Sequence, residues 1–258
     1  MSRGQLILTG LGIVLIVVLM QLPTVVVKNE SENDLEMHSM EVSDSDASAI
    51  QSLRAKIKVS QNENLTNFAD SLAKYYLKYG YLDSAIQVGK QYMVKENSSL
   101  ITLNAAGAIF YSAFERAQTP EEASERIALA QAVYQRIVEQ DSSDLLAKTR
   151  LAMTLVTSEN PMVGITMLRE VLAQDPQYRE AILNLGLLSI RSGQYDRAIE
   201  RFQKLLSMDS LDYEAMLYNA IALQEIDPDE SKRYLELIAQ SPDADPALVV
   251  TAQQYLEN

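Results

Sequence analysis

Residues 145–178, LLAKTRLAMTLVTSENPMVGITMLREVLAQDPQY, and residues 179–212, REAILNLGLLSIRSGQYDRAIERFQKLLSMDSLD, are two versions of one 34-residue pattern. A small residue stands at the same place in each version, Ala152 in the first and Gly186 in the second. The apolar residues follow the spacing of two amphipathic helices joined by a short turn. The pattern therefore predicts stacked helical hairpins. Further matching pairs are Ala147 and Ala181, Leu151 and Leu185, Gly164 and Ala198, Leu168 and Phe202, Val171 and Leu205, and Asp175 and Asp209.

This period, with small residues at fixed points of a helix–turn–helix unit, resembles the tetratricopeptide repeat family. The resemblance implies an all-α fold, a right-handed α-solenoid of about five repeats. Extended along the chain, the pattern predicts repeats at 66–99, 100–144, 145–178, 179–212 and 213–242. A capping helix is expected at 245–257, because the last repeat of a solenoid otherwise exposes an apolar face.

Two segments depart from the plain repeat. Ile50, Leu53 and Ile57 predict a leading helix over 45–60, which packs either on the first repeat or in the groove of the solenoid. The second repeat holds about eleven extra residues around 115–125. We expect this insertion to lengthen the second helix of its repeat; a separate recognition edge is the alternative.

The amino terminus predicts a membrane anchor. After a short tail, 1–4, the predicted anchor is 5–27. The uncharged run from Gly4 to Val27 would span about 36 Å as a helix, enough for a hydrocarbon core of about 30 Å. A cleavable signal peptide is the alternative, but its apolar core would be shorter, and no Ala-x-Ala site follows. We therefore expect an uncleaved transmembrane helix of a bacterial type.

The few flanking charges suggest an orientation. Arg3 precedes the apolar run and Lys28 follows it, after which acidic residues dominate 28–44. The positive-inside rule favours a single-pass inner membrane protein with its amino terminus in the cytoplasm and its bulk in the periplasm. The opposite topology, a cytoplasm-facing scaffold, stays open. Residues 28–44 are expected to form a solvated tether, since they hold few large apolar residues.

Composition excludes several functional classes. The net charge of −13 argues against nucleic-acid binding, which needs a basic face. The chain has no cysteine, and its one histidine, His38, lies between two methionines without other ligands at metal-binding spacing. No phosphate loop or nucleophile elbow is present. We therefore expect neither an enzyme, nor a metal or other cofactor, nor a small-molecule substrate.

The expected binding surface is a concave groove, which in the resembled family is lined by the first helix of each repeat. Three rows of equivalent residues follow from the register, with Arg191 near the end of one of these helices. The rows are Arg150, Asn184 and Tyr218; Met153, Leu187 and Ile221; and Thr149, Leu183 and Leu217. The groove would be largely apolar with polar groups at its centre, which is typical of a partner site. Alternatively, some of these side chains belong to the core.

The best-known motif of the family, a Lys/Asn/Arg clamp for a terminal carboxylate, does not match here. Asp70 stands where a clamp lysine is expected, and Glu214 is acidic at another basic position. The leading hypothesis is a membrane-anchored module that binds a protein or peptide client, in secretion, envelope or complex assembly. Self-assembly through the end repeats is a further possibility, and the oligomeric state is unknown.

Overall fold

The computed structural model describes residues 42–157 and 161–257, and the chain divides into two units at the boundary between Glu41 and Val42. The predicted anchor at 5–27, the tether up to residue 41 and His38 lie outside the described residues. Among the residues that are described, no helix is long and apolar enough to cross a membrane.

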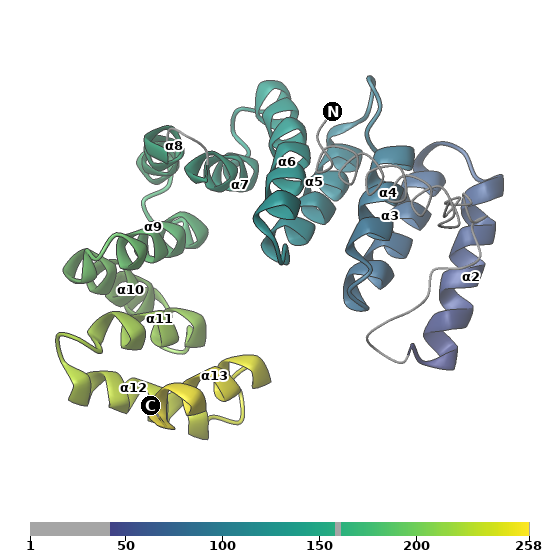
Figure 1. The fold of residues 1–258 in the computed structure, drawn as a ribbon. Helices are drawn as coiled ribbons and strands as arrows, with labels where there is room; N and C mark the ends of the chain where they lie inside the picture. Colours follow the sequence, from purple (N-terminus) through teal and green to yellow (C-terminus); the bar gives the residue numbers. More distant parts are fainter. Residues whose placement is uncertain (1–41, 158–160, 258) are drawn as a thin grey trace, which may run out of the picture. The chain divides into compact units, whose positions relative to one another are not determined.

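Twelve helices and no strands make up the described part of the chain (Figure 1). The first six are α2 (Asp44–Val59), α3 (Asn62–Lys78), α4 (Leu82–Tyr92), α5 (Leu100–Glu115), α6 (Pro120–Gln140) and α7 (Leu145–Val156). The other six are α8 (Pro161–Gln174), α9 (Arg179–Arg191), α10 (Tyr195–Met208), α11 (Tyr213–Leu223), α12 (Pro228–Gln240) and α13 (Pro246–Glu257). The fold is therefore an all-α helical repeat.

Local sequence signals set many of the helix ends. The Thr119 hydroxyl accepts a hydrogen bond from the Glu122 N–H at the start of α6, and Pro120 occupies the first turn. Asp144 and Asp212 cap α7 and α11 in the same way. These oxygens pair amide groups that a helix start leaves without an internal partner. At the other end of α9, Gly193 takes the left-handed conformation (φ 70°) that favours glycine.

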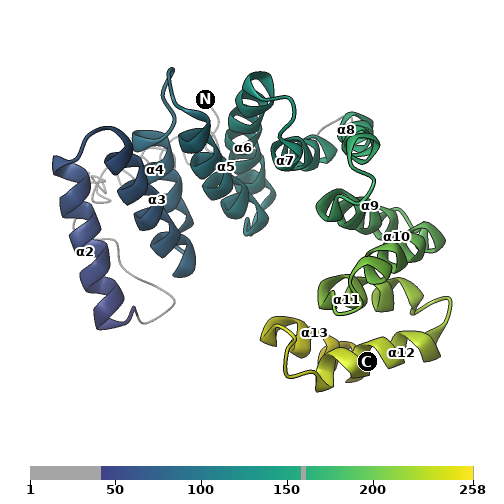
Figure 2. The same ribbon diagram turned by 180° about the vertical axis from the view of Figure 1, so that it is seen from behind.

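Successive helices pack as antiparallel pairs. The views from both sides show α9 and α10 side by side, and α11 beside α12 (Figures 1 and 2). Between pairs, α3 contacts α5, α7 contacts α9 and α9 contacts α11, whereas no contact of similar extent joins two even-numbered helices of the described chain. The odd-numbered helices therefore form one layer, and the even-numbered helices form the other.

Small residues allow the two layers to approach closely. A Cβ atom at Gly186 would lie 2.4 Å from the ring of Phe202 on α10, closer than packed atoms can approach. Ala152 and Ala220, 34 residues away on either side, are fully buried. Gly186 costs about 1 kcal/mol as a helix-interior glycine relative to alanine, and the close packing of Phe202 offsets this cost.

The leading helix packs on the first hairpin. Ile50 and Ile57 of α2 are buried in the same cluster as residues of α3 to α6. The Arg54 Nε donates a hydrogen bond of 2.9 Å to the Tyr76 hydroxyl on α3. Among the described helices, α2 makes an extensive contact with α3 alone, so it does not cover α7, α9 or α11. In the second repeat, the longer helix is α6 with its 21 residues.

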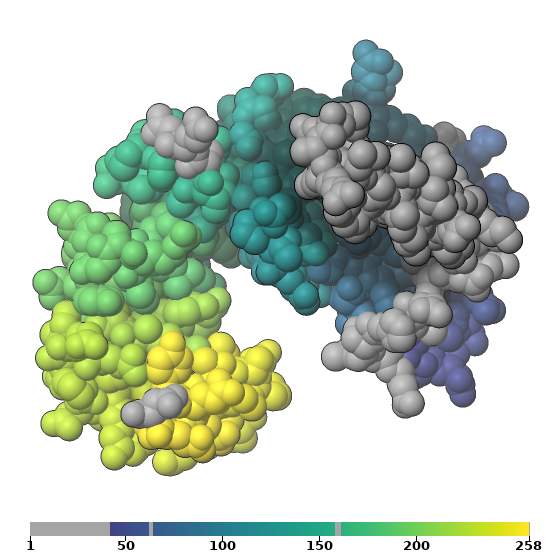
Figure 3. Space-filling model, in the orientation of Figure 1, coloured from purple at the N-terminus to yellow at the C-terminus, as the bar shows by residue number. Residues whose placement is uncertain are grey.

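The last helix packs against the end of the array. α13 contacts α12 extensively and α11 to a smaller extent, and its Ala252 is fully buried. The space-filling view shows the side chains of these last helices, in yellow-green and yellow, packed together (Figure 3). The apolar residues of α11 and α12 that would otherwise face solvent, such as Met216 and Leu235, share one core cluster with Ala252.

Candidate functional site

Helices α7, α9 and α11 together form one face of the repeat, which we call the odd-helix face. The three predicted rows of residues fall on these helices. Met153, Leu187 and Ile221 stand at equivalent positions and are half-buried, so each leaves apolar surface accessible. They lie at the edges of three different apolar clusters, because each helix packs into a different part of the core. This row forms an apolar stripe across three helices.

One predicted row does not line a surface. Thr149, Leu183 and Leu217 are only 2%, 8% and 3% exposed. Leu183 and Leu217 belong to core clusters with residues of α10 and α12. The helical rotation of 100° per residue turns these positions towards the layer behind, whereas the next residue in each helix stays accessible. The expectation that this row contributes to the groove is therefore corrected, and these three residues are core.

Arg150 is the central polar group of the odd-helix face. Its guanidinium lies 5.4 Å from the ring centre of Tyr111 on α5 and 5.8 Å from that of Tyr134 on α6. The Arg150 Nη1 donates a hydrogen bond of 2.7 Å to the Tyr134 hydroxyl. The two rings meet edge to face at 6.1 Å. This cation–π arrangement fixes a half-buried guanidinium in one orientation.

The electrostatics keep these tyrosines neutral. Burial raises the pKa of Tyr134 to about 12, although the nearby Arg150 acts in the opposite direction. Burial likewise raises the pKa of Tyr111. In the described residues, Arg150 forms no ion pair at bonding distance with a carboxylate. Most of its donor groups are therefore available to an anionic or carbonyl group of a partner.

Carboxylates surround this cation at longer range. Glu115 at the end of α5 is exposed as a residue, yet desolvation of its carboxyl raises its pKa, and Arg150 and Arg116 oppose that rise. The Glu214 carboxylate on α11 raises the pKa of Glu115 further. The odd-helix face therefore combines one fixed cation with acidic groups from helices on either side of it.

The other two members of the Arg150 row are also half-buried. The Asn184 Nδ2 donates a hydrogen bond of 2.8 Å to the Glu180 carbonyl, one turn earlier in α9. The Tyr218 ring lies 6.0 Å from the Phe202 ring, and burial raises the pKa of its hydroxyl. Arg191 is exposed in the last turn of α9. The structure thus brings Arg150, Asn184 and Tyr218 onto one face, with Arg191 towards its end.

Sequence reasoning missed the two tyrosines that hold Arg150. Tyr111 follows the small position Gly107 by four residues, but the extra residues of the second repeat interrupt the 34-residue register between Tyr111 and Arg150. Tyr134 lies on an even-numbered helix, where a buried aromatic residue is usual in a core. No residue pattern marks these rings as neighbours of Arg150.

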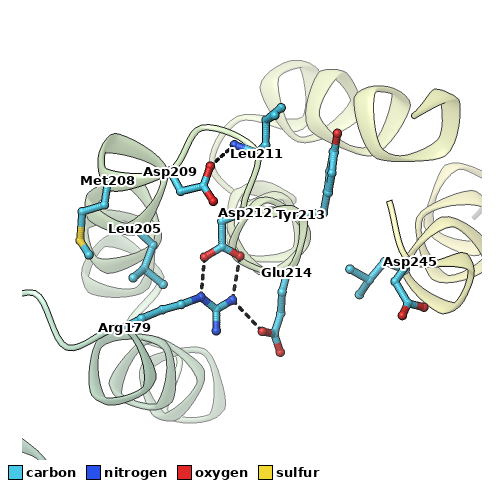
Figure 4. Close-up of a pocket in the computed structure, with 10 residues that line it drawn as sticks. Arg179, Leu205, Met208, Asp209, Leu211, Asp212, Tyr213, Glu214 and Asp245 are labelled. Carbon is cyan, nitrogen blue, oxygen red and sulfur yellow. Dashed lines mark hydrogen bonds and ion pairs between the residues drawn. The ribbon is translucent and has the colours of Figure 1, made fainter. Parts of the chain in front are cut away.

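A second concave feature lies where α9, α11 and α13 begin (Figure 4). We call it the α10–α11 cleft, a space of about 330 Å³ bounded by Leu205, Met208, Asp209, Leu211, Tyr213 and Asp245, among others. One wall is an ion-pair network. The Arg179 guanidinium donates two hydrogen bonds of 2.7 Å to the Asp212 carboxylate and one of 2.8 Å to Glu214.

These features suit binding. Within residues 42–157 and 161–257, no group of three or more His, Asp or Glu side chains is placed to hold a metal ion. The odd-helix face instead offers an apolar stripe, aromatic rings and an oriented cation, which are typical of protein interfaces.

Comparison with known proteins agrees with this architecture. Residues 164–218, from α8 into α11, match the sequence model of the tetratricopeptide repeat family. No protein among those with curated descriptions matches the chain. A tetratricopeptide repeat protein from Parabacteroides merdae superposes with a TM-score of 0.61 at 16% identity, over 82% of this chain and 79% of its own. A thermophilic protein of this type in Thermus thermophilus gives 0.54 at 17%, over 69% and 90%.

These similarities concern the fold and one segment of the sequence. At such low identity the two structures show the fold alone, which is a helical repeat of the tetratricopeptide type. The matched segment supports the same family from the sequence. Repeats of this kind commonly serve protein–protein interaction, while the fold itself carries many different functions.

Proposed function

We propose that this protein is a non-enzymatic interaction module that binds a peptide or a helix of a client protein on its odd-helix face. The observation that carries the proposal is the half-buried stripe of Met153, Leu187 and Ile221 beside the oriented guanidinium of Arg150. An accessible apolar stripe with one fixed polar anchor fits the anatomy of a recognition surface. The client's apolar side chains lie on the stripe, and a polar group of the client pairs with Arg150.

We also propose that the module acts at the bacterial inner membrane. Support comes from the uncharged run at 5–27, which is long enough to span a bilayer, and from the acidic tether at 28–44. With Arg3 on the cytoplasmic side, the repeats lie in the periplasm and hold a client during secretion or envelope assembly. A cytoplasm-facing scaffold is the competing arrangement.

The binding proposal is tested with Leu187→Glu in the full chain. A carboxylate in the middle of the stripe opposes burial of apolar client groups, since a charge loses its hydration there. Recovery of cross-linked client from cells is expected to fall about tenfold or more, which corresponds to roughly 1.4 kcal/mol. Circular dichroism and the melting temperature show whether the fold is kept.

The matched control is Leu237→Glu, because Leu237 is 53% exposed on α12, outside the odd-helix face. This variant introduces the same charge but should leave client recovery unchanged. Equal recovery with both variants, each folded, would place the binding site elsewhere, for example at the α6 insertion. A photoreactive residue at Leu187 adds a direct readout, since it should form a client adduct that the same residue at Leu237 does not form.

A further inference from the structure

The α10–α11 cleft is a second concave surface, separate from the apolar stripe of the odd-helix face. Part of its lining is apolar, and two of these apolar side chains are exposed to solvent. Leu211 is 62% exposed and Met208 is 41% exposed. Leu205, which also lines the cleft, is buried in the core. A volume of about 330 Å³ lies at the lower end of the range for ligand pockets.

Acidic groups border this apolar cleft. The Asp209 Oδ1 accepts a hydrogen bond from the Leu211 N–H, and the Asp245 Oδ1 accepts one from the Ala247 N–H. Each carboxylate thus uses one oxygen to fix its own turn. In the described residues, the second oxygens of Asp209 and Asp245 and the Oε1 of Glu214 have no hydrogen-bond partner. All three residues line the cleft; Figure 4 shows Asp209 beside Asp212 on one side of the start of α11 and Asp245 on the other side, at the start of α13.

The single cation of the cleft does not cancel this charge. Arg179 already donates three hydrogen bonds, two to Asp212 and one to Glu214. The lining of the cleft therefore holds one guanidinium and four carboxylates, those of Asp209, Asp212, Glu214 and Asp245. The net negative charge favours a positively charged ligand, and the apolar part of the lining favours one that also carries a hydrocarbon surface.

We propose that the α10–α11 cleft binds a segment of a partner protein in which a lysine or arginine stands next to a large apolar residue. The apolar side chain lies on Met208 and Leu211. The cationic head group pairs with a free carboxylate oxygen at the border of the cleft, from Asp209 or from Asp245. Long basic side chains suit this arrangement, since their methylene stems cover apolar surface while their charge remains at the rim.

The test uses the full chain in detergent and a defined probe, a fluorescent dodecapeptide of alternating leucine and lysine with blocked ends. The variant is Asp209→Asn with Asp245→Asn, in which both amides still accept the turn-fixing hydrogen bonds but lose their charge. Because the partly solvated charge contact disappears whichever carboxylate makes it, the dissociation constant should rise about fivefold. Leu211→Ser should weaken binding as well without affecting folding.

A matched double variant separates the cleft from the general acidity of the chain. Asp175 accepts from the Gln177 N–H and Asp227 accepts from the Glu230 N–H, so they hold equivalent turns outside the cleft. Asp175→Asn with Asp227→Asn changes the net charge equally and should leave the dissociation constant within about twofold. Equal weakening by both double variants would overturn the proposal, because it would show unspecific attraction to a chain of net charge −13.

Two further measurements test the cleft proposal. A peptide with glutamate in place of lysine should bind far more weakly; equal binding, or no saturable binding of the lysine peptide, would also overturn the proposal. Binding of the lysine peptide in the cleft does not depend on the client site on the odd-helix face. Leu187→Glu should therefore keep its affinity for the lysine peptide, whereas its client recovery falls.

Discussion

At the residue scale, Asn219 is a core position occupied by a polar side chain. It is fully buried on α11, and neither its Nδ2 nor its Oδ1 has a hydrogen-bond partner in the described residues. The equivalent positions 34 and 68 residues earlier are Leu185 and Leu151, both buried. An unpaired buried amide destabilises a fold, because it has lost hydrogen bonds to water without replacement.

Asn219→Leu should therefore stabilise the protein. The expected gain is about 1–2 kcal/mol in the free energy of unfolding, somewhat reduced by the cost of fitting a larger side chain. Thermal or urea unfolding measures it. Asn184→Leu is the control, since the Asn184 amide is half-buried and donates to the Glu180 carbonyl, so no gain is expected there. Destabilisation by Asn219→Leu would show that the buried amide has a partner.

At the element scale, the contact between α9 and α11 depends on one ion-pair network. Asp212 accepts from Arg179 and also caps α11 through the Ala215 N–H, at 3.0 Å. Burial alone would raise the pKa of Asp212, but the hydrogen bonds from Arg179 and from Ala215 outweigh it and hold that pKa below its usual value of 3.8. The network therefore links two repeats and orients a helix start.

A pH dependence follows from the lowered pKa of Asp212. A carboxyl group with a lowered pKa in the folded state contributes stability above its unfolded pKa, and this contribution is lost as pH falls through the folded pKa. Arg179→Met should cost about 1–2 kcal/mol at neutral pH, a figure reduced because Arg179 is partly exposed. The difference from wild type should shrink as pH falls below the unfolded pKa of about 3.9 and then through the lower folded pKa, where Asp212 becomes protonated.

Melting temperatures of both proteins between about pH 3 and 7 measure this difference. Lys232→Met provides the control, because its pairing with Glu236 is long, at 4.0 Å, and exposed. That variant should change stability by less than about 0.5 kcal/mol at any pH. A constant difference between Arg179→Met and wild type across the range would show that Arg179 stabilises by packing and not through the Asp212 charge.

The elements also show what can be predicted from the sequence. The 34-residue register identifies paired helices, and residues such as Gly186 mark the close contact with Phe202 that the structure contains. Register alone does not tell Leu183, which is buried, from Leu187, which is half-buried, because both are leucines four residues apart on one helix. Side-chain exposure depends on how far each helix is rotated against its neighbours. The identity of an apolar residue does not indicate that rotation.

The functional surfaces are harder to predict, since they combine residues that are distant in sequence. The register places Arg150 on the odd-helix face, but its orientation depends on Tyr111, which lies beyond an insertion that interrupts the register, and on Tyr134, which lies on an even-numbered helix. The α10–α11 cleft likewise brings together Asp209, at the end of α10, and Asp245, just before α13. Aspartates that accept a hydrogen bond from a nearby backbone N–H are common in turns and give no signal of a shared cleft.

At the scale of the whole molecule, the proposed membrane anchor allows two topologies, with the repeats on either side of the membrane. The proposed topology puts Val42–Asn258 in the periplasm, with 5–27 as the anchor. It depends on the length of the uncharged run and on the positive charge of Arg3 and the amino terminus, opposed only by Lys28 at the far boundary. The two topologies give the repeats different sets of clients, so the orientation determines which clients can reach the odd-helix face.

Protease accessibility distinguishes the two topologies. With a tag at the carboxyl terminus, the repeats should be digested in intact spheroplasts and protected in inverted inner-membrane vesicles, because the proposed orientation exposes them only in the former. A cytoplasmic protein and a periplasmic protein serve as controls in the same samples. Protection in spheroplasts with digestion in vesicles would reverse the orientation and favour a cytoplasmic scaffold. Release of the intact chain from membranes by high salt would contradict the anchor itself, since a spanning helix is held by apolar burial that salt does not weaken.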